Sequence, residues 1–254
     1  MKTICMEEMT ALDIRSAIER GFSTVLVAVG STEQHGPHLP TMTDTRIGDA
    51  VVERVARILG DALKARSVPV GVSHHHLAFG GTVSLKPDTL RLVLLDYIDS
   101  LIRCGFRRIV LLPTHGGNFP TVLETLDAAR GAYPGVDVTG YADLMGLMDF
   151  LNSLSAGFGV TEEEAGGHAG ENETSMMMAL EPGLVVPERF APGYLGPTGE
   201  AEFKLILERG MPALTANGVL GDPRKASREK GEIYIERFAQ FLAEKIGRSS
   251  SPSR

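Results

Sequence analysis

Four side chains that can bind a metal or move a proton occur in one short stretch, "VGSTEQHGPHLPTMTD", which ends at Asp44. They are Glu33, His35, His38 and Asp44, and they follow a continuous apolar run typical of a strand covered on both faces. In an extended backbone, residues i and i+2 point to the same side, so Glu33 and His35 can face one site. Carboxylate and imidazole together suit zinc, manganese or iron(II), and a carboxylate can bridge two cations. We therefore expect Glu33, His35 and Asp44 to be metal ligands, with helix capping as the alternative for Asp44.

Two further histidines extend this set. His115 lies in "PTHGGN", after another apolar run, where glycines let the backbone approach closely. Ligands from separate strand ends suit a two-metal hydrolytic site, in which a shared hydroxide attacks a polarised carbonyl. His168 lies in "EEEAGGHAGENETS", between glutamates, and a histidine so placed can shuttle protons, although a mobile loop histidine is the alternative. Glu173 is either a further ligand or part of a helix cap.

The run His74-His75-His76 comes after a predicted strand and before "LAFGGTVSL". Adjacent strand residues point to opposite faces, so at most two of these imidazoles converge. We expect His76 to reach the pocket and contact substrate.

Strands alternate with helices along the chain, which predicts a mostly parallel sheet with helices on both faces. In such sheets, ligands bind beyond the carboxyl ends of the strands, where the histidine motifs lie. We expect one domain over residues 1–247, a loop over 150–170 and a disordered tail over 248–254. The predicted strands cover 23–30, 67–73, 107–113 and 135–141, and the predicted helices cover 10–21, 44–60, 87–105, 119–133, 173–180 and 227–247.

Composition excludes several classes of partner. The 254-residue chain has a formal net charge of −7 and no basic block, which argues against nucleic acid. The N-terminal segment contains acids and lacks a long apolar core, unlike a signal peptide, and no apolar run is long enough to span a bilayer. We expect a cytoplasmic protein that acts on a small molecule.

Five motifs together resemble the creatininase family of metal-dependent amidohydrolases: "GSTEQHGPHLPTMTDT", "GGTVSL", "PTHGGN", "GHAGENETS" and "ASREKGE". They occur in order from Gly30 to about Glu232. The resemblance implies a single α/β/α domain, two divalent ions (zinc, manganese or iron) and a homohexamer. It implies Glu33 and His115 on one ion, His35 on the other, Asp44 as the bridge, and proton transfer by His168.

The chain also departs from creatininase proper. Gly117 stands where that enzyme has a metal-binding glutamate, and Gly167 stands where a glutamate precedes the shuttle histidine. The chain contains no tryptophan, whereas creatininase proper closes indoles over its ligand. Glu173 or water would then complete the metal site, and we expect His38, Gly116 and Gly117, with His76, to contact substrate.

These patterns predict hydrolysis of a non-peptide C–N bond, in a cyclic or linear amide, by a metal-bridging hydroxide, with little specificity for creatinine. Three alternatives stay open. They are the trimming of a modified peptide, the ring opening of a cyclic ketone, and a metal-binding scaffold without turnover.

Overall fold

Four parallel strands form the central sheet of the computed structural model, which describes residues 1–247. The order across the sheet is β2-β1-β3-β4. All residues of β1 and β3 are buried, as their continuous apolar sequences predict. The strands are β1 (Thr24–Val29), β2 (Ala62–Lys64), β3 (Arg108–Pro113) and β4 (Asp137–Gly140).

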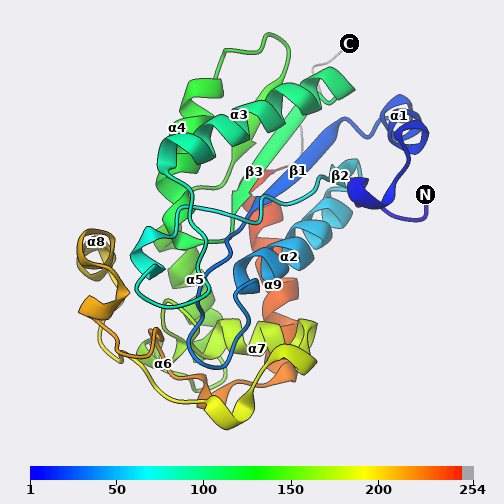
Figure 1. Ribbon diagram of the computed structural model, residues 1–254. Coiled ribbons are helices and arrows are strands. Elements are labelled where there is room, and N and C mark those ends of the chain that lie inside the picture. Colours follow the sequence, from blue (N-terminus) through cyan, green and yellow to red (C-terminus); the bar gives the residue numbers. More distant parts are fainter. Residues whose placement is uncertain (248–254) are drawn as a thin grey trace.

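Helices cover both faces of this sheet, which confirms the predicted α/β/α fold (Figure 1). Leu26 and Ala28 of β1 pack with α2 and α9, while Val25 and Val27 face the layer of α1, α3 and α4. The α-helices are α1 (Ala11–Glu19), α2 (Thr43–Leu59), α3 (Pro87–Cys104), α4 (Phe119–Ala129), α5 (Leu144–Ala156), α6 (Glu162–Ala165), α7 (Glu171–Leu180), α8 (Glu200–Arg209) and α9 (Arg228–Ile246). Short 3-10 turns cover Met6–Glu8, His74–His76, Gly116–Asn118, Pro182–Leu184, Pro187–Arg189, Met211–Ala213 and Pro223–Lys225.

Local sequence explains where several helices begin and end. Thr10 and Asp13 form a reciprocal capping box at the start of α1. Pro87 occupies the first turn of α3, and Gly105 ends that helix in the left-handed conformation. These boundaries agree with the helices predicted from the sequence.

Two predicted segments are wrong. Residues 67–73 do not form a strand; they make one isolated bridge, between Val68 and Val29, and the second strand is β2 instead. Pro69 has no N–H to donate to a ladder, so the chain leaves the sheet there. Residues 150–170 are not a loop, because they contain the end of α5 and all of α6. Asp143 accepts from Gly146 N–H to start α5, and a Thr161–Glu164 capping box starts α6.

The sheet places two strand ends side by side. Val29 pairs with Pro113 at the ends of β1 and β3, so the segments that follow both strands leave from neighbouring points. From β1 the chain continues to β2 on one side of this pair, and from β3 it continues to β4 on the other side. Open α/β sheets bind ligands at the point where the direction of the connections reverses in this way. Among the described residues no helix is both long and apolar enough to cross a membrane. The predicted tail, 248–254, lies outside the described residues.

Candidate metal centre

Asp44 lies between two histidines. Its Oδ1 is 3.2 Å from His35 Nε2, and its Oδ2 is 3.2 Å from His115 Nδ1. Glu33 approaches the same His115 nitrogen, with Oε1 3.2 Å from Nδ1. The structure therefore brings together four of the five predicted ligands, and one carboxylate faces both imidazoles.

The local chain path explains this placement. After β1 the backbone forms a wide turn that is closed by Glu33 N–H donating to Thr41 C=O at 2.9 Å, and α2 then begins at Thr43. Asp44 lies in the first turn of α2, and its carboxylate points to the histidines instead of capping the helix. Gly30 permits the approach of this turn, because a Cβ there would lie 2.7 Å from Thr45 Cα.

Backbone carbonyls orient both histidines. His35 Nδ1–H donates to Glu33 C=O at 3.1 Å, and His115 Nε2–H donates to Val72 C=O at 3.0 Å. The other nitrogen of each ring, Nε2 of His35 and Nδ1 of His115, then faces the carboxylates. A metal-binding histidine is usually held in this way, with its second nitrogen fixed by an acceptor.

The charges of the cluster are buried and incompletely satisfied. Glu33 is fully buried and Asp44 is 3% exposed. Both oxygens of Glu33 and Oδ2 of Asp44 make no hydrogen bond within residues 1–247. Leaving such groups unpaired in a protein interior is costly, so a cation is expected to complete them. The donor set, three carboxylates and two imidazoles, fits a pair of divalent ions.

The pKa values of the histidines reflect the same charges. Burial lowers the pKa of His35, but Asp44, then Glu173 and Glu33, outweigh burial and raise it to about 10. Burial likewise opposes a charge on His115, and Glu33 and Asp44 raise its pKa well above the ordinary value. The surroundings of both imidazoles therefore favour a positive charge. In the metal-free protein, a bound proton supplies that charge.

Glu173, from α7, approaches the same nitrogen of His35 as Asp44 does. Its Oε2 is 3.8 Å from His35 Nε2 and accepts from Ala169 N–H. Ala169 has φ of 52°, an uncommon value for a residue with a side chain. Burial, with Asp44 and Glu33 nearby, raises the pKa of Glu173. The carboxylate lies where it could bind a metal ion together with His35.

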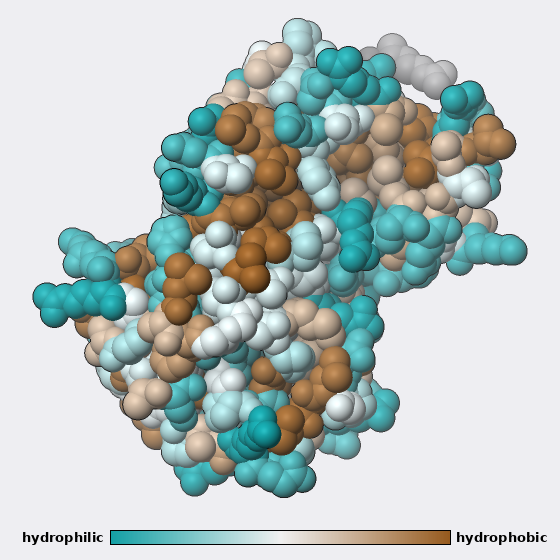
Figure 2. Space-filling view, viewed as in Figure 1, coloured by the Kyte–Doolittle hydropathy of each residue, from teal (hydrophilic) through white to brown (hydrophobic). Residues whose placement is uncertain are grey.

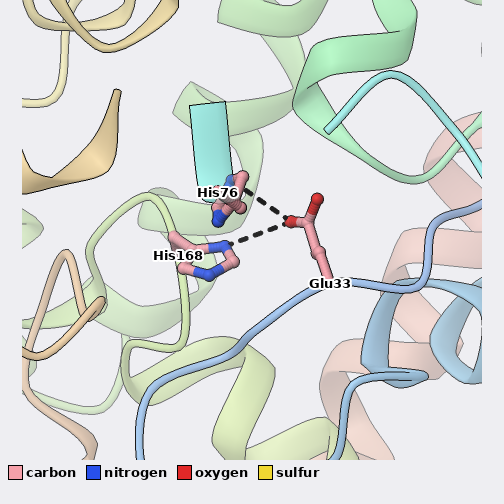
Figure 3. Close-up of side chains that lie close together, drawn as sticks. All are labelled: Glu33, His76 and His168. Atoms are coloured by element: carbon pink, nitrogen blue, oxygen red, sulfur yellow. Dashed lines mark ion pairs between the residues drawn. The ribbon is translucent and has the colours of Figure 1, made fainter. Parts of the chain in front are cut away.

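A second group of three surrounds Glu33. His76 Nε2 is 3.4 Å and His168 Nδ1 is 3.7 Å from Glu33 Oε1. Figure 3 shows both imidazoles directed at this one oxygen. His168 also lies against His35, with ring centroids 4.2 Å apart. Proton transfer by His168 and substrate contact by His76 thus remain predictions that this placement supports.

Sequence reasoning missed Gln34, which fixes this second group. Gly36 N–H donates to Gln34 Oε1 at 2.9 Å, so Nε2 of the amide is the donor to His76 Nδ1, 2.9 Å away. His76 then carries its proton on Nε2, facing Glu33. His168 Nε2–H donates to the backbone C=O of Gln34 at 2.8 Å, which leaves its Nδ1 as an acceptor. The signal was present in "EQH", but side-chain alternation suggested only that Gln34 points away from the ligands.

The remaining predicted residues lie differently. His38 is buried away from these groups, with Nε2 2.9 Å from Thr174 Oγ1, so its position does not favour substrate contact. Gly117 faces the protein interior, because a Cβ there would meet Val72 O at 2.2 Å and His115 Nε2 at 2.6 Å. Gly116 borders an open hollow. His75, not singled out by sequence, stacks on His115 with centroids 5.7 Å apart.

The fold and this cluster define a metal-dependent enzyme of the α/β class, with ligands at the carboxyl edge of a parallel sheet. The chain belongs to the creatininase family, because the family model described as creatinine amidohydrolase matches residues 7–246. It is therefore a hydrolase of the amidohydrolase type.

Two relatives and one solved structure illustrate the similarity. The chain is 34% identical to a mycofactocin precursor peptide peptidase of Mycolicibacterium smegmatis, over 88% of this chain and 84% of that protein. It is 30% identical to the creatinine amidohydrolase of Pseudomonas putida, over 99% of each chain. A crystal structure of creatinine amidohydrolase matches all of both chains with a TM-score of 0.82 and 30% identity. Solved creatininases of this kind include a manganese form and a zinc form.

Proposed function

We propose that the chain is a two-metal hydrolase that cleaves the C–N bond of an amide, and that creatinine is not its main substrate. Water adds to the carbonyl carbon, the C–N bond breaks, and the products are a carboxylate and an amine. Two divalent ions, zinc, manganese or iron, would supply the Lewis acidity and an ionised water at neutral pH.

The position of Asp44 is the observation that carries this proposal. Its two oxygens face different imidazoles at equal distances of 3.2 Å, and each imidazole has its other nitrogen held by a backbone carbonyl. Glu33, His115 and one Asp44 oxygen would hold one ion. His35, Glu173 and the other Asp44 oxygen would hold the second. No carboxylate is needed at Gly117, where the packing excludes a side chain.

We propose His168 as the residue that moves the proton. Its Nε2–H is tied to the backbone of Gln34, and its Nδ1 faces the ligand carboxylate Glu33. Burial, and then His35, lower the pKa of His168 well below the ordinary value, so it is neutral and can first accept a proton. It can then deliver that proton to the leaving nitrogen, which avoids expelling an unprotonated amide anion.

Metal analysis of purified variants tests the two-ion assignment. We expect two ions per chain in the unmodified protein, loss of both in Asp44→Ala, and loss of one in His35→Ala. His74→Gln is the matched control, because His74 is exposed and lies outside the cluster. A protein that binds no zinc, manganese or iron(II) and is not activated by them would refute the proposal. Metal binding without turnover of any amide would favour the scaffold alternative.

Peptide trimming is the second candidate, because several relatives of this chain are named as precursor peptide peptidases. The same residues would act on a peptide bond. A side-by-side assay of formamides, lactams, short peptides and creatinine separates the candidates. Turnover of creatinine with kcat/KM of about 10⁴ M⁻¹s⁻¹ or more, the low end of ordinary enzymes, would contradict the proposal.

We also propose that the protein forms a homohexamer, as the family resemblance implies, and that it works in the cytoplasm. Figure 2 shows apolar side chains gathered over α3 and α4, where Leu92 and Leu123 are 56% and 49% exposed. Contiguous apolar surface of this kind is common where chains associate. A monomer mass in light scattering would contradict the assembly and leave the catalytic proposal intact.

A further inference from the structure

An apolar hollow adjoins the metal centre and has no role in holding the ions. One face of α5 forms a wall of this hollow, through side chains that recur at helical spacing: Leu144, Leu147, Met148 and Leu151. Asp44 and Glu173 also line it, so the hollow opens beside the ligands that bridge and complete the metal site. Its volume is about 90 Å³. A group bound there would lie next to the reacting carbonyl.

A second hollow of about 60 Å³ lies beside the first. The two share Gly116, Leu144, Met148 and Gly167, and the second extends to Phe203 and Ile206 of α8. Two small neighbouring hollows, bordered mainly by apolar side chains, therefore lie beside the metal centre.

The two shared glycines keep this space open. A Cβ at Gly167 would lie 3.4 Å from Met148 Cε and 3.5 Å from Thr198 Cβ, and a Cβ at Gly116 would lie 3.6 Å from Phe203 Cε2. These distances are ordinary van der Waals contacts, and neither glycine has a positive φ. The backbone thus tolerates a side chain at both positions. A side chain there would fill the hollow.

The charges around the first hollow argue against an ionic occupant. Among residues 1–247, its charged lining residues are Asp44 and Glu173, whose oxygens face the metal ligands, and no lysine, arginine or histidine lines it. An anionic group would meet no cation there, and a cationic group would compete with the metal ions for the carboxylates. The amides of Asn152 and Asn172 and the hydroxyl of Thr114 are the neutral polar groups on its border.

We propose that the substrate carries an uncharged branched aliphatic group, of the size of an isobutyl group, next to the scissile amide carbonyl. This inference rests on the proposed amide hydrolysis and names the substrate class for that site. An apolar cavity of roughly 150 Å³ holds a benzene ring. Each of the two hollows is smaller than that cavity. Each suits an aliphatic branch better than a flat aromatic ring or an indole, and the flexible Met148 can adapt to its shape.

A series of small amides tests the proposal on the metal-loaded protein. Acetamide, isovaleramide and the cationic β-alaninamide are compared by calorimetric binding and by release of ammonia. Each buried methylene is worth about a fourfold gain in affinity, so isovaleramide should bind roughly 60-fold more tightly than acetamide. β-Alaninamide should gain nothing over acetamide. Equal binding of acetamide and isovaleramide, or tighter binding of β-alaninamide, would overturn the proposal.

Space-filling variants show whether the hollow itself provides the preference. Gly167→Leu should reduce the isovaleramide-to-acetamide affinity ratio to about fourfold or less, with metal content unchanged. Gly183→Leu is the matched control, because Gly183 has open space around it and no positive φ. The milder Gly167→Ala should lower the ratio part of the way if Gly167→Leu fails to fold. A ratio unchanged in a folded Gly167 variant would contradict the assignment.

The two readouts separate this proposal from the proposed function. Preferential binding of isovaleramide without hydrolysis of any amide would support the hollow and contradict amide hydrolysis. Hydrolysis of amides without an aliphatic preference would support the function and overturn the hollow.

Discussion

Each imidazole that faces Glu33 or Asp44 has one nitrogen held by another group of the protein. Backbone carbonyls hold His35, His115 and His168, and the amide of Gln34 holds His76. The ring orientations are therefore set before any ion or substrate arrives. Preorganised donors and acceptors need no rearrangement when charge develops, which is how such groups contribute most to catalysis.

Replacing His168 by glutamine tests its role in proton transfer. Glutamine can still donate to the backbone carbonyl of Gln34, but it has no titratable nitrogen. We expect turnover to fall by about 10²–10⁴-fold, with metal content unchanged. Steady-state kinetics and elemental analysis on the same preparation check this. Loss of metal would reassign His168 as a ligand, and unaltered turnover would mean that it takes no part in the reaction.

Metal affinity should depend on pH, because protons and metal ions compete for the same nitrogens. In the metal-free protein the pKa of His35 is about 10 and that of His115 is raised, so both rings are protonated at pH 7. Binding of an ion displaces these protons, and affinity therefore rises with pH. For each proton displaced, we expect about a tenfold gain in zinc affinity per pH unit between pH 6 and 8. Competition titrations at three pH values measure this, and a constant affinity would contradict it.

At the residue scale, the grouping of the candidate ligands was visible in the sequence where their spacing is local, and their binding of metal stays a prediction. Glu33 and His35 share one face of an extended segment, and this alternation is visible without a structure. The role of Gln34 was not visible, because its partners, His76 and Gly218, are distant in sequence. The packing around Gly117 was equally hidden, since it depends on Val72.

At the scale of elements, one buried carboxylate connects three helices around the aliphatic hollow. Glu171, at the start of α7, is fully buried and accepts from Ser155 of α5, at 2.9 Å, and from Tyr234 of α9. Lys230 of α9 pairs with the same carboxylate at 3.1 Å. This cluster explains the motifs "GENETS" and "SREKGE" structurally, because it fixes α5, the wall of the hollow, against α7 and α9.

Glu171→Gln should therefore destabilise the protein. The substitution leaves Lys230 with no carboxylate partner at this position and replaces charge-assisted hydrogen bonds, so we expect a loss of about 2 kcal/mol in the free energy of unfolding. Denaturant unfolding measures this loss. The control is Glu163→Gln, which alters an exposed carboxylate and should change stability by less than about 0.5 kcal/mol. Equal stability of the two variants would show that the cluster does not hold the helices together.

The predicted elements succeeded where one pattern dominated and failed where patterns competed. The continuous apolar runs of β1 and β3 and the long amphipathic pattern of α3 were recognised correctly. The helix α5 was not recognised, because serines and glycines in 150–170 suggested a loop. Leu144, Leu147 and Leu151 recur at helical spacing in α5, and this apolar stripe could have predicted the helix.

At the scale of the whole molecule, four distant segments converge on one site. The ligands and their partners come from the β1–α2 turn, the 3-10 turn at His74–His76, the end of β3 and the start of α7. The parallel register of β1 and β3 predicts that two of these segments meet. The other two could not be placed from the sequence, because their approach depends on how α7 and the 67–76 segment cross the edge of the sheet.

Bound metal should stabilise the entire fold, because it connects these segments and neutralises their charges. The metal-free protein buries the carboxylates of Glu33 and Asp44 close together. Each ion present at 100 times its Kd adds about 2.7 kcal/mol to the free energy of unfolding, so two ions add about 5 kcal/mol. For a chain of this size, about 1 kcal/mol raises Tm by roughly 2–4 °C, and we expect zinc to raise Tm by roughly 10–20 °C over the chelator-treated protein. Asp44→Asn should remove most of this Tm difference, because it weakens the binding of both ions. His74→Gln should leave the Tm difference unchanged. A Tm unaffected by chelation would mean that no ion connects these segments, and the buried carboxylates would then need another partner.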